Sequence, residues 1–278
     1  MRKLRRDGVA LFYEEAGGGD LPLLFVHGWC CDHTYFAPQF ERFRRKHRVV
    51  AVDLRGHGQS NKPHQSYTME GFADDVAWMC DRLRIEKPVM IGHSMGGIVA
   101  FDLACRYPTL PSAIVMLDAA AVLPGGSRAA SPHLIEGLRG ADYQEVQRQY
   151  VASSLFIPTD NQQRKERILE DMSSAPQHMM ASAMESILTY DAAVVAEGCV
   201  VPALYIAADE PQPRTDMGRL HELLPQLTDG KTVGSGHFCQ LEVPEQVNPM
   251  IERFLTSPSR CDPAALALLE AKPDGPAV

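Results

Sequence analysis

The sequence contains no apolar run that approaches the roughly 18 residues needed for a membrane-spanning helix. It also lacks a Cys-x-x-Cys pair, and none of its cysteine and histidine residues have the spacing of a zinc site. No internal repeat or low-complexity segment is present. These absences argue against a membrane-embedded protein, a zinc-stabilised domain and a repeat architecture.

Positive charge is scarce as well, because 27 lysine and arginine residues face 35 aspartate and glutamate residues. The resulting net charge of -8 argues against a nucleic-acid partner and against a basic surface that binds membranes. The basic stretch 1–6 is not followed by an apolar segment, so we expect no signal peptide. Seven cysteines, an odd number that includes the adjacent Cys30 and Cys31, indicate reduced thiols and a cytoplasmic location.

The rest of the composition is that of an ordinary globular protein, with 45% apolar residues over 278 positions. This length suits one large α/β domain, or one such domain with an insertion. Strand-like and helix-like segments alternate in the first part of the chain. We expect strands at 8–16, 21–26, 49–53, 88–91 and 113–117, and helices at 35–46, 68–84 and 97–107.

This alternation predicts an α/β protein with a mostly parallel, doubly wound sheet. Several of the strands are continuous apolar runs, which is typical of strands that are buried on both faces. Polar residues lie at or just past the C-terminal ends of four of them: His27, Asp53, Ser94 and Asp118. Because ligands bind beyond the carboxyl ends of parallel strands, we expect these side chains to gather along one edge of the sheet.

The pattern changes after Pro124. Residues 132–199 show no strand pattern, and we expect helices near 133–139, 141–156, 160–174 and 177–197. A strand is expected again at 202–207, followed by a helix at 215–225, a short strand at 231–233 and a helix at 244–255. We therefore divide the chain into an α/β core at 1–123 and 201–260, a helical cap at 124–200 and a peripheral tail at 261–278.

The stretch 86–100 carries the strongest functional signal. A short apolar strand runs into Gly92-His93-Ser94-Met95-Gly96, and a helix follows. The order strand, G-x-S-x-G, helix is that of a nucleophile elbow, in which a serine sits on a sharp and strained turn. Only residues without a Cβ fit beside it, and the N–H of Met95 lies at a helix N-terminus, where it can face a developing negative charge.

A serine hydroxyl needs a neighbouring base, and His237 is the candidate among ten histidines. It lies in a glycine-rich loop, 234–238, after the last expected strand, and such a loop can reach over the edge of the sheet. Five other histidines lack a comparable setting and are expected at the surface: His33, His64, His133, His178 and His221. The turn that contains Asp53, Arg55 and Ser60 is expected to brace the nucleophile strand through hydrogen bonds.

These motifs resemble the α/β-hydrolase-fold superfamily, in particular the small capped type that includes esterases, lactonases, non-metal haloperoxidases and carbon–carbon bond hydrolases. The matching residues run along the chain: Asp7-Gly8, His27-Gly28, Asp53-x-Arg55-Gly56-x-Gly58-x-Ser60, Gly92-x-Ser94-x-Gly96-Gly97, Gly236-His237 and Glu242-x-Pro244. The resemblance implies Ser94 as nucleophile and His237 as base. It also implies an oxyanion hole made by the backbone N–H groups of Trp29 and Met95.

The acid that orients His237 has more than one candidate. The usual family position follows the strand at 202–207 in a G-x-x-D turn, but this chain has Asp209 there without the glycine. Asp118, after the preceding strand, is where some members of this fold carry the acid, and we favour it. Asp209 is the alternative, and Glu210 is third.

A more specific similarity is to cofactor-free 2,4-dioxygenases that open hydroxy-quinolone rings and share this fold. In that group a His-Asp pair deprotonates the substrate, which then reacts with oxygen directly. This chain departs from the group by having Cys31 in place of a histidine, Met95 after the serine, and His27-Gly28 in place of Pro-Gly. These departures favour ordinary hydrolysis.

We therefore expect a serine hydrolase that cleaves a small, mostly apolar ester, lactone or related carbonyl compound through an acyl-enzyme on Ser94. Cofactor-free oxygenation and a non-catalytic ligand-binding role are the alternatives. The residues expected to line the substrate pocket are His27, Gly28, Cys30, His93 and Phe238. No metal or organic cofactor is expected; the partner is a small-molecule substrate, neither nucleic acid nor membrane, and a homodimer is left open.

Overall fold

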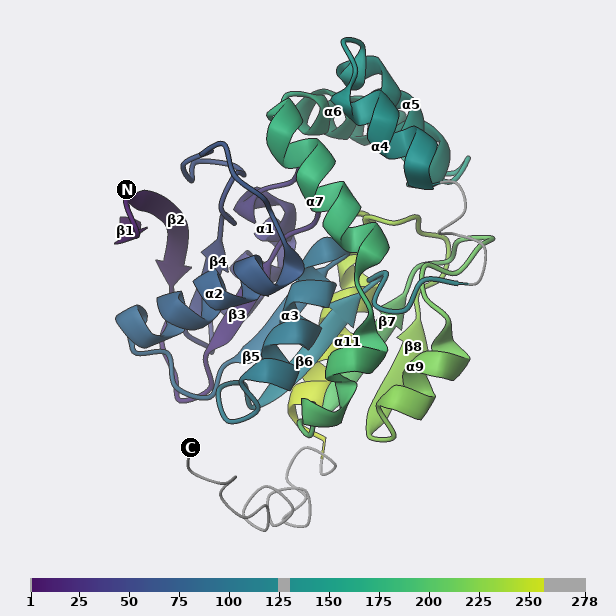
Figure 1. Cartoon of the computed structure of the whole chain (residues 1–278). Coiled ribbons are helices and arrows are strands. Elements are labelled where there is room, and N and C mark those ends of the chain that lie inside the picture. Colours follow the sequence, from purple (N-terminus) through teal and green to yellow (C-terminus); the bar gives the residue numbers. More distant parts are fainter. Residues whose placement is uncertain (1, 125–130, 258–278) are drawn as a thin grey trace.

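A computed structural model describes residues 2–124 and 131–257 of the chain. Eight strands form one sheet in the order β1-β2-β4-β3-β5-β6-β7-β8. Figure 1 shows helices on both faces of this sheet and a separate group of helices above one of its edges. The predicted α/β class with a mostly parallel, doubly wound sheet is confirmed.

The strands are β1 Arg2–Arg6, β2 Val9–Ala16, β3 Leu23–Val26, β4 Val49–Val52, β5 Val89–His93, β6 Ala113–Leu117, β7 Ala203–Ala207 and β8 Leu227–Lys231. The pairs β1–β2 and β2–β4 are antiparallel, and all the others are parallel. Val26 pairs with Gly92, and His93 pairs with Leu117. The loops after β3, β5 and β6 therefore begin side by side at one edge of the sheet.

The helices that cover the sheet are η1 His33–Phe36, α1 Ala37–Phe43, α2 Met69–Leu83, α3 Met95–Arg106, α9 Met217–Leu223, α10 Cys239–Glu242 and α11 Pro244–Leu255. Successive residues of each inner strand enter opposite cores, since Phe25 joins the one under α1 and α11 while Leu24 joins the one under α2 and α3. The predicted N-cap Thr68 accepts a hydrogen bond from Gly71 N at 3.0 Å, and α2 begins directly after it.

Four helices stand over the carboxyl edge of the sheet: α4 Ser131–Arg139, α5 Tyr143–Ser154, α6 Gln162–Ser173 and α7 Gln177–Thr189. The single helix expected at 177–197 is wrong, because the backbone is extended at Tyr190 and Asp191 caps a new start. The resulting short helices α8 Ala192–Val195 and η2 Ala196–Gly198 contact α3 of the core. The domain limits at 123 and 200 stay predictions, and the tail at 261–278 lies outside the described residues.

Two strands differ from expectation. Strand β1 is not predicted, because Arg2–Arg6 is an edge strand with four basic residues and no apolar alternation. The last strand is β8 at Leu227–Lys231 rather than 231–233. Val233 cannot pair in the sheet because the side chain of Gln246 binds both its N–H and its carbonyl oxygen. Among the described residues, no helix combines the length and apolar character that crossing a membrane requires.

Candidate active site

Ser94 lies between β5 and α3 with backbone angles φ 55° and ψ -120°. A serine in this region is strained, and the packing around it fixes the turn. A Cβ on Gly92 would lie 2.0 Å from Gly96 O, and a Cβ on Gly96 would lie 2.0 Å from Val26 O. Neither position can hold a larger residue without backbone movement, which agrees with the steric reason for the G-x-S-x-G pattern.

His237 and Asp118 meet over the same edge of the sheet. His237 Nδ1 donates to Asp118 Oδ2 at 2.6 Å, and Asp118 Oδ1 accepts from Ala208 N at 3.0 Å. Both side chains are buried. The hydrogen bond to Asp118 fixes the proton of neutral His237 on Nδ1, which leaves Nε2 as the basic atom.

The alternative acids lie elsewhere. Asp209 is partly exposed, forms an ion pair with Lys231 at 2.7 Å and accepts from Gly234 N at 3.0 Å. It supports the loop that precedes His237 without contacting the ring. Glu210 forms an ion pair with Arg214 at 2.7 Å, and a carboxylate oxygen of it lies within 4.8 Å of ligand atoms of Asp118 and His237.

Burial is the main influence on the ionisation of the His237–Asp118 pair. It lowers the pKa of His237 well below 6.5, and the positive charge of Arg214 lowers it further. Burial also raises the pKa of Asp118, although the Ala208 N–H and Arg214 act in the opposite direction. At neutral pH His237 is therefore held in the uncharged form that can accept a proton.

The loop after β3 carries the expected oxyanion donors. Within the described residues, the backbone N–H of Trp29 donates to no acceptor, and that of Met95 is the first of a helix, where N–H groups have no intrahelical partner. Cys30 has a φ of 57°, so the loop is also strained at this point. The indole Nε1 of Trp29 donates to Met180 O of α7 at 3.0 Å, which ties the loop to the cap helices.

A cavity of about 680 Å³ opens above these groups, between the sheet edge and the cap helices. Ser94, His237 and three of the expected pocket residues line it: Gly28, His93 and Phe238. Two expectations are wrong, because neither His27 nor Cys30 lines this cavity, and the neighbouring Cys31 does. Met172 and Met184 are two of several apolar side chains that line the remainder of the cavity.

His27 supports the loop after β3 instead. His27 Nδ1 donates to Gly28 O at 2.8 Å, and its Nε2 accepts from Leu54 N at 3.1 Å, so it joins the loops after β3 and β4. His93 lines the cavity but also acts as a support, since its Nε2 donates to His237 O at 2.9 Å. Burial lowers the pKa of His93 to about 3, which keeps this ring neutral.

The nucleophile and base face one cavity but do not bond to each other. Within the described residues, no hydrogen bond joins Ser94 Oγ to the ring of His237. Such contacts are often long in a free enzyme and shorten when substrate binds. The arrangement therefore has the base–acid half of a triad fully formed.

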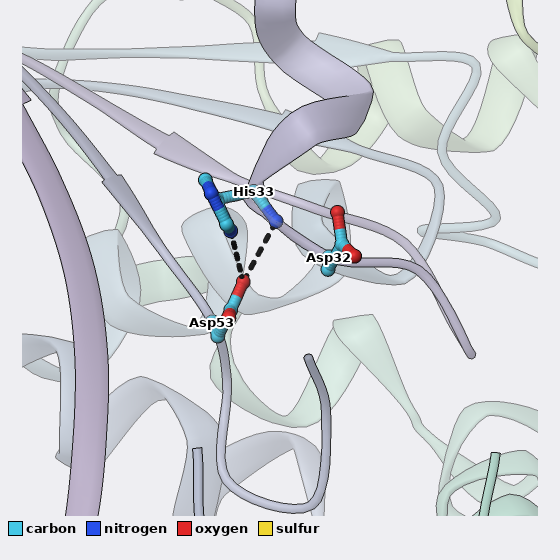
Figure 2. A group of neighbouring side chains, drawn as sticks. All are labelled: Asp32, His33 and Asp53. Atoms are coloured by element: carbon cyan, nitrogen blue, oxygen red, sulfur yellow. Dashed lines mark hydrogen bonds and ion pairs between the residues drawn. The ribbon is translucent and has the colours of Figure 1, made fainter. Parts of the chain in front are cut away.

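A second histidine–aspartate pair joins the start of η1 to the end of β4 (Figure 2). Asp53 Oδ1 accepts from both the backbone N and the ring Nδ1 of His33, at 2.8 and 2.7 Å, and Asp53 Oδ2 accepts from Gln59 N. His33 is therefore not a surface residue, as its side chain is only 10% exposed. The prediction fails because nothing near His33 in the sequence marks a partner 20 residues away.

The turn after β4 supports elements other than the nucleophile strand. Ser60 Oγ donates to Asp53 O and accepts from Phe12 N of β2, and Arg55 forms an ion pair with Asp75 of α2. The expectation that this turn braces the nucleophile strand is wrong, because these hydrogen bonds reach β2, α2 and the loop at His33.

Two groups in the described part of the chain bring three potential metal ligands within 4.8 Å: Asp32 with His33 and Asp53, and Asp118 with Glu210 and His237. In the first group Asp53 is already occupied by three N–H donors, and Asp32 caps η1 through Thr34. In the second group Arg214 occupies the space near both carboxylates. In both groups the carboxylates are thus already engaged by donors of the protein itself.

Arg214 lines the cavity beside Glu210 and is not predicted from the sequence. It stands in Pro211-Gln212-Pro213-Arg214, a loop with no periodicity and no motif. The only available signal is the four-residue spacing between Glu210 and Arg214, and that spacing implies an ion pair only on a helix.

The chain belongs to the alpha/beta hydrolase fold family, whose profile matches residues 22–244. The bifunctional esterase/perhydrolase DCH of Acinetobacter calcoaceticus is 38% identical over 117 residues, which cover 41% of this chain and 42% of that enzyme. The chain spans about two fifths of the length of curated relatives in such matches.

Solved structures are similar over more of the chain. A thermophilic esterase from Thermogutta terrifontis, solved with malate bound, has a TM-score of 0.81 and 26% identity over 92% of this chain and 98% of its own. The enol-lactonase from Burkholderia xenovorans LB400 has a TM-score of 0.81 and 24% identity over 92% of this chain and 100% of its own. At 24% identity, the similarity to the enol-lactonase supports the fold alone. The relatives are esterases, lactonases and other hydrolases of this fold.

Proposed function

We propose that the protein is a serine hydrolase that cleaves a small, mostly apolar ester or lactone through an acyl-enzyme on Ser94. The observation that carries the proposal is the meeting of strained Ser94 and the His237–Asp118 pair at one apolar cavity. Fold alone would leave the function open, because this architecture supports many activities.

In the first step Ser94 Oγ attacks the substrate carbonyl carbon while His237 Nε2 takes the hydroxyl proton. Asp118 accepts from Nδ1 and stabilises the imidazolium that forms. The carbonyl electrons move onto oxygen, where the N–H groups of Trp29 and Met95 are available as donors. The carbon–oxygen bond to the leaving group then breaks, and the leaving oxygen takes the proton from His237.

The acyl-enzyme is released by the same groups in reverse. His237 removes a proton from a water molecule, and the resulting hydroxide attacks the acyl carbon. The bond between the acyl carbon and Ser94 Oγ breaks, and His237 returns the proton to Ser94. A cavity of about 680 Å³ with apolar walls such as Trp29, Phe156 and Phe238 supports a compact acyl group with few polar substituents.

The test is labelling with a fluorophosphonate probe read by intact mass, together with turnover of p-nitrophenyl esters. Wild type should form a one-to-one adduct, and Ser94→Ala should lose it with a fall in turnover of at least about 10³-fold. Ser153→Ala is the matched control, since Ser153 lines the same cavity but, among the described residues, its hydroxyl bonds to other residues of α5 alone. This variant should keep the adduct and the turnover.

No adduct and no ester turnover in wild type would refute the acyl-enzyme mechanism. Cofactor-free oxygenation is then the second candidate, favoured by the His237–Asp118 hydrogen bond, which that chemistry also needs. Oxygen consumption with hydroxy-quinolones that persists in Ser94→Ala and disappears in His237→Gln would establish it. Ligand binding without either reaction would indicate a binding protein.

A further inference from the structure

Arg214 is a buried cation beside the candidate base and acid. Its side chain is 17% exposed and extends from the loop between β7 and α9. Its Nη2 donates to Glu210 Oε1 at 2.7 Å and to Ser154 O at the end of α5. The guanidinium is thus held between the core and a cap helix, in a fixed position.

The Nε atom of the same guanidinium lies near Asp118. Arg214 Nε lies 3.6 Å from Asp118 Oδ2, the same oxygen that accepts from His237 Nδ1 at 2.6 Å. Arg214 Nε is buried and forms no hydrogen bond within the described residues. Its positive charge therefore acts on the carboxylate mainly through space, and it disfavours a second positive charge on the imidazole.

Glu210 supplies the opposite charge. Its carboxylate is bonded to Arg214 and has an oxygen within 4.8 Å of ligand atoms of both Asp118 and His237. A negative charge at this distance favours the imidazolium form, which opposes the influence of Arg214. The two residues thus form a charge pair whose members act on His237 with opposite signs.

Other titratable groups come from each neighbouring element: His93 on β5, Tyr205 on β7, Tyr150 on α5, Asp160 before α6, and Cys239 and Glu242 on α10. Burial lowers the pKa of His93 and raises the pKa of Tyr205 and of Cys239, so these groups stay uncharged near neutral pH. Asp160 and Glu242 lie against the backbone at Gly236.

We propose that Arg214 and Glu210 are positioning residues that together set how readily His237 accepts a proton. Arg214 keeps Asp118 ionised and lowers the basicity of His237, and Glu210 restores part of that basicity. This inference rests on the proposed function, because it assigns a task to the base of the same site. It also predicts a signature that packing alone would not produce, namely opposite shifts from two residues that are bonded to each other.

The experiment measures the pH dependence of kcat/KM for ester hydrolysis, whose acid limb reports the ionisation of the free enzyme. Arg214→Gln should move the acid limb to higher pH by about one unit, and Glu210→Gln should move it to lower pH by a similar amount. The double variant should return towards wild type, and Arg214→Lys should stay close to it. Asp209→Asn is the control, since it removes a neighbouring carboxylate that is paired with Lys231, and it should leave the limb unchanged.

Shifts of the same sign, or unchanged limbs in the folded single variants, would overturn the proposal. A rise in KM for Arg214→Gln without a shift would also overturn it, because Arg214 would then act on the substrate. Where Arg214→Gln does not fold, Glu210→Gln still tests the proposal, because an upward shift or an unchanged acid limb in this variant would overturn it.

Titration of the His237 ring by NMR in the same variants separates the two proposals. Opposite shifts of the ring in a protein without ester turnover would support the charge pair and refute the hydrolase. Ester turnover without opposite shifts of the ring would support the hydrolase and refute the charge pair.

Discussion

Two histidine–aspartate pairs lie at the same edge of the sheet and look alike in isolation. Asp53 follows β4 and Asp118 follows β6, and their carboxylates bind His33 and His237 through Nδ1 at 2.7 and 2.6 Å. Of the two rings, His237 lines the cavity with Ser94 and His33 does not. The comparison shows that such a pair is not by itself a catalytic device.

The surroundings of the two rings differ in charge. Burial alone would lower the pKa of His33, but its hydrogen bond to Asp53 and the carboxylates of Asp53, Asp32 and Glu14 raise it. Burial lowers the pKa of His237, and Arg214 acts in the same direction. One ring is stabilised as a cation in an ion pair, whereas the other is kept neutral and able to take a proton.

The two carboxylates differ in what they support. Asp53 accepts two backbone N–H groups in addition to the ring of His33, and so joins three segments of chain. Asp118 accepts one backbone N–H, and its other oxygen serves His237. We therefore expect loss of Asp53 to act on stability and loss of Asp118 to act on catalysis.

The largest effect is expected from Asp118→Asn. An amide that donates to Nδ1 imposes the wrong tautomer on His237, so kcat should fall by about 10⁴-fold. The thermal midpoint should change little, because the amide oxygen of the new side chain can still accept from Ala208 N. Steady-state kinetics with p-nitrophenyl esters measures the first quantity and calorimetry the second. Asp209→Asn, the equivalent change in the alternative acid, should stay within about twofold of wild type in kcat; the reverse ranking would make Asp209 the acid.

Asp53→Asn should instead lower the stability of the fold and leave kcat nearly unchanged. Replacing a buried carboxylate that accepts three N–H donors leaves at least one donor unsatisfied, at a cost of about 2 to 4 kcal/mol in the free energy of unfolding. Denaturant unfolding measures this loss, and kcat of the folded fraction should remain within about threefold of wild type. If kcat fell as far as in Asp118→Asn, Asp53 would have a catalytic role, and the distinction between the two aspartates would be wrong.

The smallest effects are shifts of stability with pH, and these should have opposite signs for the two rings. The raised pKa of His33 gives a contribution that is fully present below pH 6.5 and is lost as pH rises through that raised value. His33→Gln should therefore lower the thermal midpoint more near pH 5 than near pH 8.

His237 behaves in the reverse way. Its pKa is lowered, so the unfolded chain binds the proton more tightly and folding becomes less favourable as pH falls below 6.5. His237→Gln removes this penalty, and its midpoint relative to wild type should rise as pH falls. Thermal scans of both variants between about pH 5 and 8 test these two predictions. If the midpoint difference from wild type changed with pH in the same direction for both variants, one of the two rings would not have the charge state assigned to it.

The sequence predicts much of the core and the elbow because both depend on local rules. Continuous apolar runs predict the buried strands β3 to β7, and the glycines at 92 and 96 mark a turn that only glycine fits. The topology rule for parallel sheets also brings Asp118 and Ser94 to one edge. Strands without an apolar pattern, such as β1 and β8, give no comparable signal.

Long-range placement is where prediction from the sequence fails. His27 and Cys30 flank residues that line the cavity but do not line it themselves. The ring of His27 is bonded to Gly28 O and Leu54 N, and the backbone at Cys30 has a positive φ of 57°. Likewise, nothing local distinguishes His33, bound to buried Asp53, from an exposed histidine such as His64.

The fold class, the strained serine between Gly92 and Gly96 and the glycine loop of His237 can all be predicted from the sequence, because they follow from apolar periodicity or from local steric limits. That Asp118 rather than Asp209 contacts His237, and that Arg214 and Glu210 lie beside them, becomes visible in the folded chain alone. Hydrogen bonds and charge effects depend on distances of a few ångström, and the residues that form this site are up to 119 positions apart in the sequence.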